Sequence, residues 1–227
     1  LLKTKKTVTK NFSNMNATPH QVHNLIILDE SGSMYSIQSI IMSGFNELVQ
    51  TIQGISREFP EQEHFISFFT FNSLGTKILH FADKADKLQA INNETYKPDA
   101  STPLFDAMGL ALTKMEDHLK GKTDYNVLVT ILTDGEENAS REYSGNDIKK
   151  LVERLKENKW TFTYMGTDHD VEKIASSLAI NNTLAFAKTS EGISTMFAEE
   201  KMARRNFSNK LSKDLDPTFS DYFSKKK

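Results

Sequence analysis

Residues 25–33 read Leu-Ile-Ile-Leu-Asp-Glu-Ser-Gly-Ser, four apolar side chains followed directly by polar ones. A short unbroken apolar run that ends in a polar turn is typical of a strand buried on both faces of a sheet. The pattern recurs at residues 127–132, which Thr133, Asp134 and Gly135 follow. Strands of this kind occur in parallel sheets covered by helices, so the two segments favour an α/β fold.

Segments with the three- and four-residue spacing of amphipathic helices alternate with the apolar segments. The pattern predicts a doubly wound, mainly parallel six-stranded sheet with helices on both faces. Residues 77–81 follow residues 65–71 after a short turn, which predicts a hairpin and one antiparallel edge strand. The expected strands are residues 25–28, 65–71, 77–81, 127–132, 161–165 and 183–187. The expected helices are residues 37–52, 84–91, 103–119, 148–155, 171–178 and a long one from residue 190.

The chain of 227 residues contains no internal repeat and no interior linker, which favours a single domain. We expect a flexible polar extension at residues 1–21, the domain at residues 22–210 and a tail at residues 211–227. Four aromatic residues lie near the C-terminus, and they either pack back on the domain or dock into a partner. They are Phe207, Phe219, Tyr222 and Phe223.

Composition narrows the class of function. Without cysteine, the chain can form neither a disulfide nor a thiolate metal site. A net charge of −2 gives no general attraction to nucleic acid or to a membrane surface, and no apolar run is long enough for a membrane span. The first residues do not resemble a signal peptide, so we expect a cytoplasmic protein. The first residue is not Met, however, and a secreted origin stays open.

Oxygen donors follow the predicted strands at the edge where ligands bind in open α/β sheets. The first strand is followed by Asp29, Ser31 and Ser33, the fourth by Asp134, and the helix from Pro103 is preceded by Thr102. Two carboxylates and three hydroxyls are ligands that a hard divalent cation prefers. The sequence therefore predicts a Mg²⁺ site, or a Mn²⁺ site in substitution.

These motifs resemble the metal-ion-dependent adhesion site of von Willebrand factor type A domains. The resemblance rests on residues 29–34 (Asp-Glu-Ser-Gly-Ser-Met), residues 102–104 (Thr-Pro-Leu) and residues 133–136 (Thr-Asp-Gly-Glu), in that order. It covers residues 22 to about 200, and residues 45–48 and 164–168 are similar to poorly characterised bacterial and bacteriophage members. Family members often carry Gly shortly before the threonine, where this chain has Asp-Ala-Ser at residues 99–101.

The resemblance implies a binding module and not an enzyme. In the family, the two serines and the threonine ligate the metal directly, whereas the aspartates often act through water. A partner protein would offer an Asp or Glu carboxylate to the metal, and a shift between Asp134 and Thr102 as direct ligand would act as a switch. The alternatives are a scaffold whose metal only braces three loops and a metal-assisted hydrolase.

Three further acids lie close to these motifs. Glu30 and Glu136 are either solvated loop residues or residues that act behind the metal ligands. Asp106, near the start of the helix from Pro103, is expected to stabilise the helix N-terminus, and the alternative is again a contact behind the ligands.

Overall fold

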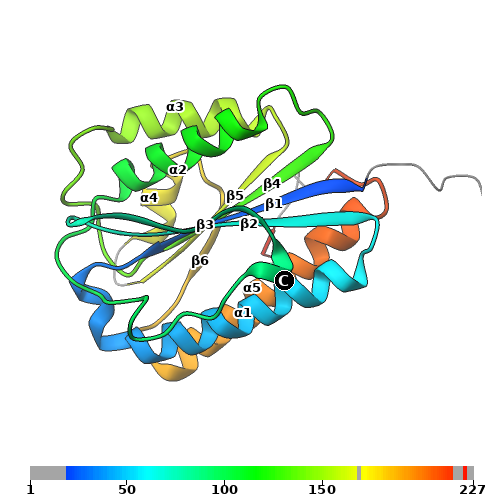
Figure 1. The fold of residues 1–227 in the computed structure, drawn as a ribbon. Helices are drawn as coiled ribbons and strands as arrows, with labels where there is room; N and C mark the ends of the chain where they lie inside the picture. The colour runs from blue at the N-terminus through cyan, green and yellow to red at the C-terminus, as the bar shows by residue number, and fades with distance from the viewer. Residues whose placement is uncertain (1–18, 168–169, 217–221, 224–227) are drawn as a thin grey trace, which may run out of the picture.

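The computed structural model describes residues 19–167, 170–216 and 222–223, and it confirms the predicted sheet (Figure 1). Six strands form one sheet of order β3-β2-β1-β4-β5-β6, in which only the β2–β3 pair is antiparallel. Of the flexible extension expected at residues 1–21, residues 1–18 lie outside the described residues, while His20 and Gln21 already belong to β1, so the extension ends earlier than expected. The strands are β1 (His20–Asp29), β2 (Gln62–Asn72), β3 (Gly75–Lys84), β4 (Tyr125–Leu132), β5 (Trp160–Gly166) and β6 (Asn182–Ala185).

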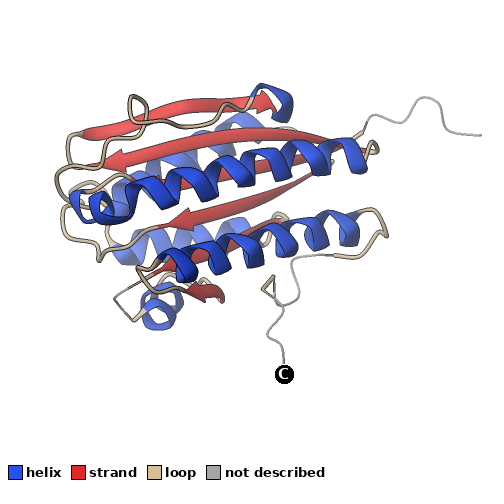
Figure 2. Cartoon of the chain, turned by 90° about the horizontal axis from the view of Figure 1, so that it is seen from below, coloured by secondary structure: helices blue, strands red, loops and turns tan. Residues whose placement is uncertain are grey.

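Helices cover both faces of the sheet. One face carries α2 (Leu104–Leu119), α3 (Gly145–Lys156) and α4 (Val171–Ser177), and the other carries α1 (Gln38–Glu58) and α5 (Ser190–Leu211). Seen from below, α1 and α5 lie side by side across the sheet (Figure 2). Two 3₁₀ turns, η1 (Gly32–Ile37) and η2 (Ala85–Lys87), complete the described elements.

The apolar run of β1 feeds two separate cores because successive side chains of a strand point to opposite faces. Leu25 and Ile27 pack under α2 and α3, whereas Ile26 and Leu28 pack against α1 and α5. All four side chains are at most 2% exposed. Burial on both faces explains why the strand reads as an uninterrupted apolar segment.

The order of the strands reverses between β1 and β4. From β1 the chain passes to β2 on one side, and β4 returns to pair with β1 on its other side. Both strands are parallel, so their carboxyl ends lie at the same edge, where ligands of open α/β sheets bind. This edge carries the polar residues that the sequence analysis selected.

The prediction of a short helix at residues 84–91 is wrong, because only the 3₁₀ turn η2 forms there. Side chains of α1 bind the backbone of this segment and replace the hydrogen bonds of a helix. Asn46 accepts from the Ile91 N–H at 2.8 Å and donates to the Ile91 carbonyl at 3.0 Å, while Gln53 donates to the Leu88 carbonyl at 3.1 Å.

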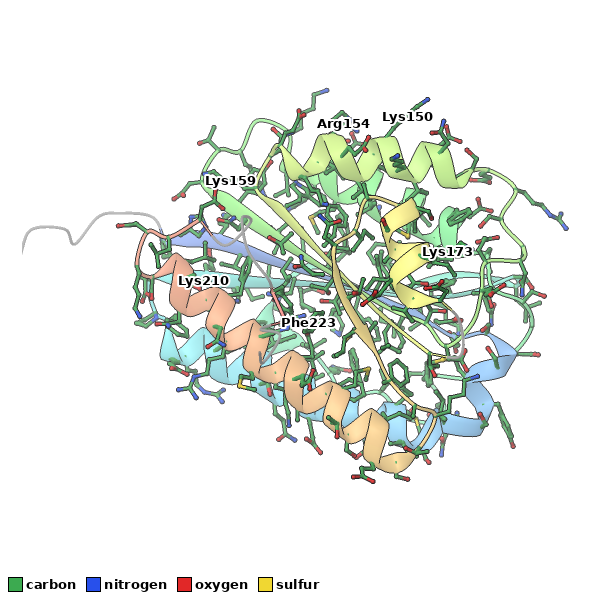
Figure 3. All side chains as sticks on the ribbon, turned by 180° about the vertical axis from the view of Figure 1, so that it is seen from behind. Lys150, Arg154, Lys159, Lys173, Lys210 and Phe223 are labelled. Carbon is green, nitrogen blue, oxygen red and sulfur yellow. The ribbon has the colours of Figure 1, made fainter. Side chains whose placement is uncertain are left out.

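The described part of the aromatic C-terminal segment packs back on the domain. Tyr222 and Phe223 are 5% and 9% exposed and belong to the core that α1 and α5 cover. Figure 3 shows Phe223 next to α5. The Tyr222 hydroxyl donates to Glu200 at 3.1 Å, and this buried carboxylate also pairs with Arg204 at 2.5 Å. Phe219 lies outside the described residues. No helix among the described residues is both long and apolar enough to cross a membrane.

Candidate metal centre

Asp29 ends β1 and is completely buried. Its Oδ1 accepts the Ser31 N–H at 2.7 Å, and its Oδ2 accepts the Thr133 hydroxyl at 2.5 Å. The Tyr96 hydroxyl donates to the Asp29 carbonyl at 2.8 Å. These three contacts come from three different segments, so the position and the rotamer of the carboxylate are both fixed.

A chain of hydroxyls connects the loop after β1 with the loop after β4. The Ser31 and Ser33 hydroxyl oxygens lie 3.1 Å apart, and the Ser33 hydroxyl donates to Asp134 Oδ1 at 2.5 Å. Ser31 and Asp134 are 1% and 2% exposed, whereas Ser33 is exposed. The centre therefore opens to solvent beside Ser33.

The third loop brings Thr102 to the same place. A Cβ added to Gly135 would lie 3.4 Å from the Ser33 hydroxyl and 3.7 Å from the Thr102 hydroxyl, so both oxygens face this glycine. Asn138 holds Thr102 from both sides: its side-chain oxygen accepts the Thr102 N–H at 2.9 Å, and its own N–H donates to the Thr102 carbonyl at 3.1 Å. The structure thus brings all five predicted metal ligands to one end of the sheet.

Residues 99–101, where family members often carry Gly, contain a residue with a left-handed backbone. Ala100 has φ +63°, a left-handed conformation that favours glycine. The Gly32 N–H donates to the Ala100 carbonyl at 2.9 Å, and the Asp99 N–H donates to the Glu30 carbonyl at 3.0 Å. These bonds hold the loop before Thr102 against the loop after β1 and offset the strain at Ala100.

The negative charges of Asp29 and Asp134 are stabilised in different ways. Burial raises the pKa of Asp29 to about 6, and the charge of Asp134 acts in the same direction, while hydrogen bonds from Thr133 and Ser31 oppose the rise. Asp134 Oδ2 is buried and has no hydrogen-bond partner among the described residues. Lys188 Nζ lies 3.2 Å from this oxygen, within ion-pair distance but without hydrogen-bond geometry.

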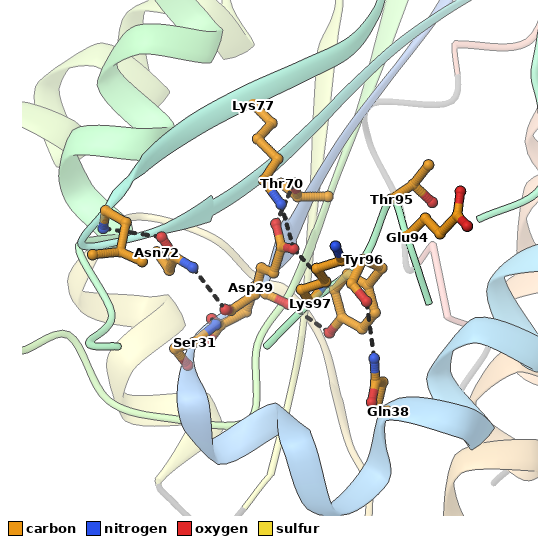
Figure 4. Close-up of polar contacts among 12 residues, drawn as sticks. Asp29, Ser31, Gln38, Thr70, Asn72, Lys77, Glu94, Thr95, Tyr96 and Lys97 are labelled. Atoms are coloured by element: carbon orange, nitrogen blue, oxygen red, sulfur yellow. Dashed lines mark hydrogen bonds and ion pairs between the residues drawn. The ribbon is translucent and has the colours of Figure 1, made fainter. Parts of the chain in front are cut away.

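Glu30 is buried, so its interpretation as a solvated loop acid is wrong; its partners Thr70, Lys77 and Lys97 are drawn in Figure 4. Its side chain is 1% exposed and accepts from Lys77 Nζ at 2.6 Å, from the Lys97 N–H at 2.5 Å and from the Thr70 hydroxyl at 2.7 Å. Glu30 therefore ties the loop that leads to Thr102 to the β2–β3 hairpin.

The other two acids have different positions. Glu136 is exposed in the loop after β4. Asp106 lies in the first turn of α2, as expected, but its carboxylate accepts the backbone N–H groups of residues 141–143 at 2.8–2.9 Å. Burial alone would raise the pKa of Asp106, but these three donors outweigh it and lower the pKa. Asp106 thus orders the loop between β4 and α3, the loop in which Asp134 lies.

The chemistry of the donor set fits a hard divalent cation. Asp134 Oδ2 is a buried carboxylate oxygen without a hydrogen-bond donor among the described residues. The Ser33 hydroxyl contacts Oδ1 of the same carboxylate, and the Ser31 and Thr102 hydroxyls lie close by. No three His, Cys, Asp or Glu side chains gather as a metal site within the described residues. The centre therefore has two carboxylates and neutral oxygens, a donor set that suits weak Mg²⁺ binding with retained water.

Sequence reasoning missed Tyr96, Asn138 and Lys188. Each is far from its partner along the chain: 67 residues separate Tyr96 from Asp29, and 36 separate Asn138 from Thr102. No local pattern marks such pairs, because the sheet topology alone brings them together. Glu137 was missed too; it lies in the loop after β4, whose residues 141–143 bind Asp106. Its carboxylate accepts the Phe105 N–H at the start of α2 at 3.0 Å.

Solved structures with a similar fold include three proteins of different size. The pilus adhesin SpaC from Lactobacillus rhamnosus GG, in an open conformation, has 15% identity and a TM-score of 0.58 over 85% of this chain and 30% of that one. Proximal thread matrix protein 1 from the mussel byssus has 13% identity and a TM-score of 0.55 over 82% and 46%. The SpRpn10 VWA domain has 9% identity and a TM-score of 0.53 over 78% and 94%.

These identities show a shared fold only, and this chain spans less than half the length of the first two proteins. No curated protein matches the sequence. The family description "von Willebrand factor type A domain", however, matches residues 25–200, which include every residue of the candidate centre. The chain therefore belongs to the von Willebrand factor type A domain family.

Proposed function

We propose that this chain is a divalent-metal-dependent protein-binding module. Asp29, Ser31, Ser33, Thr102 and Asp134 would hold Mg²⁺, or Mn²⁺ in substitution, and the bound ion would coordinate a carboxylate of a partner protein. The observation that carries the proposal is the buried Asp134 Oδ2, which has no hydrogen-bond partner among the described residues and lies at a gathering of hydroxyls. A bound metal ion would supply a direct ligand contact to this oxygen, which has an ion pair with Lys188 but no hydrogen bond among the described residues.

The charge of the centre favours an additional anion. Two carboxylates offset the charge of one divalent ion, and the remaining protein donors are neutral hydroxyls. An Asp or Glu side chain from a partner would add a charge-assisted, directional contact. The exposed position of Ser33 gives such a carboxylate a route to the centre.

The family match supports a binding role, and one structural neighbour is itself a pilus adhesin. A hydrolase is less well supported, because the hydroxyls at the centre are the proposed metal ligands. The carboxylate that accepts the Ser33 hydroxyl, Asp134, is itself a proposed ligand and would be engaged by the metal. Two of the three further acids, Glu30 and Asp106, are engaged in holding loops.

A metal that only braces the loops is also less well supported. Protein hydrogen bonds already tie the three loops together, between Gly32 and Ala100, between Thr102 and Asn138, and between Ser33 and Asp134. A brace would duplicate these contacts, whereas a binding role uses the exposed side of the centre.

A peptide-display selection against the domain tests the proposal directly. One selection contains Mg²⁺ and the other contains a chelator. We expect peptides with an essential Asp or Glu to be enriched only with Mg²⁺, and to bind the Thr102→Ala variant at least about 10-fold more weakly. Thr161→Ala, at the opposite end of β5, is the matched control and should bind as the unchanged chain does. Enrichment of the same peptides in chelator would contradict the proposal.

A further inference from the structure

Lys188 reaches the candidate centre from the edge of the sheet. It lies in the connection between β6 (Asn182–Ala185) and α5 (Ser190–Leu211), and β5 separates β6 from β4. The lysine side chain therefore crosses the end of β5 to approach Asp134, which follows β4. Its side chain is 27% exposed, whereas that of Asp134 is 0% exposed.

Lys188 contacts the carboxylate oxygen of Asp134 that does not accept the Ser33 hydroxyl. Asp134 Oδ1 accepts the Ser33 hydroxyl, and Asp134 Oδ2 lies 3.2 Å from Lys188 Nζ. The geometry is that of an ion pair without a hydrogen bond. Lys188 thus balances the charge of a buried oxygen, while that oxygen keeps its lone pairs available for another cation.

We propose that Lys188 is an internal cation that competes with the divalent metal for Asp134 and thereby weakens metal binding. The inference rests on the proposed function, since it requires a metal at this centre. Two cations that share one carboxylate repel each other, and burial strengthens this repulsion. Metal binding must therefore either move the ammonium group away from Asp134 or proceed against its charge.

The lysine can move while the backbone around it stays in place. A long, partly exposed lysine side chain readily carries its ammonium group to water. The Phe186 N–H donates to the Gly166 carbonyl at 3.0 Å, and the Thr189 side chain accepts the Gly192 N–H at 3.0 Å to cap α5. A Cβ at Gly192 would lie 2.5 Å from the Ala187 carbonyl oxygen, so the helix start also packs closely on the connection. We therefore place the competition in the Lys188 side chain.

Calorimetric titration of Mg²⁺ into the unchanged chain and into Lys188→Met tests the proposal. Methionine retains much of the length of the side chain and removes its charge. We expect Mg²⁺ to bind Lys188→Met about 10-fold more tightly or better, because removal of one nearby positive charge relieves the repulsion. Lys201→Met is the matched control. Lys201 lies on α5, pairs with Glu47 of α1 at 2.7 Å and has a side-chain exposure of 31%. Its affinity for Mg²⁺ should equal that of the unchanged chain.

Thermal melting of the same variants provides a second readout. In chelator, Lys188→Met should melt at a lower temperature than the unchanged chain, because Asp134 loses its counter-charge. Saturating Mg²⁺ should raise the melting temperature of Lys188→Met by more than it raises that of the unchanged chain.

The outcomes separate this inference from the proposed function. Equal Mg²⁺ affinity in Lys188→Met and the unchanged chain would overturn the inference and leave the metal centre intact. Binding in Lys188→Met alone would support the inference, because the lysine would then suppress binding completely. Absence of binding in both would overturn the inference together with the metal-dependent function.

Discussion

Ala100→Gly should stabilise the domain, although glycine substitutions usually destabilise proteins. Ala100 is exposed and has φ +63°, so the substitution removes left-handed strain without loss of buried surface. This strain costs a non-glycine residue about 1–2 kcal/mol. The greater freedom of glycine in the unfolded chain costs about 0.4–1 kcal/mol. The difference is a net gain in the free energy of unfolding of about 0.8 kcal/mol, or about 2–3 °C in Tm for a chain of this size.

The assay is thermal or urea unfolding in chelator, with Ala198→Gly as the matched control. Ala198 is an exposed residue within α5, where glycine should lower the free energy of unfolding by about 1 kcal/mol. The two substitutions are chemically identical and should have opposite signs. If Ala100→Gly destabilises as much as Ala198→Gly, Ala100 is not left-handed in solution, and the path assigned to the loop before Thr102 is incorrect.

Three further predictions concern buried polar contacts. Burial, with the nearby charge of Arg204, lowers the pKa of His64 to about 4. As the pH falls below 6.5, the imidazole takes up a proton in the unfolded chain but not in the folded one. The free energy of unfolding should therefore fall by about 2 kcal/mol between pH 7 and pH 5. Urea unfolding of His64→Gln should show a correspondingly weaker pH dependence, and an unchanged dependence would contradict the assignment. Thr133→Val removes the donor to the buried Asp29 carboxylate and should cost about 2 kcal/mol in chelator, measured by urea unfolding; full stability would show that another group holds the carboxylate. Tyr222→Phe should cost about 1–2 kcal/mol, since Glu200 loses a hydrogen bond, and no change in urea unfolding would show that this segment leaves the domain in solution.

The fold was largely predictable because its signals are local. The apolar runs that form β1 and β4 are buried on both faces, and the turn before residues 77–81 predicts the antiparallel pairing of β3 with β2. Residues 84–91 show the limit of such reasoning. Their apolar spacing suits a helix, but Asn46 and Gln53 of α1 bind the backbone and hold most of the segment outside a helix. A tertiary contact decides that conformation, and no local pattern reports it.

The proposed metal ligands were predictable from the sequence, but the contacts around them were not. Asp29, Ser33 and Asp134 were predicted because their residue types suit a hard cation and they follow strands that meet at one edge, and the structure brings them together. The direction of the Glu30 side chain was not predictable. Alternate residues after a strand point to opposite sides, and the partners on the Glu30 side, Lys77 and Lys97, come from distant segments. Lys188 was missed for the same reason, since sheet order alone places it beside Asp134.

Calorimetric titration of Mg²⁺ into the unchanged chain, Asp29→Ala and Asp124→Ala tests the central claim most directly. Asp124 pairs with His20 at the opposite end of the sheet and is the matched control, and circular dichroism confirms that each variant is folded. We predict saturable binding of Mg²⁺ to the unchanged chain and to Asp124→Ala, and no binding to Asp29→Ala, because the buried carboxylate is one of the two negative charges at the centre. Equal binding to folded Asp29→Ala would contradict the assignment of the metal to this end of the sheet.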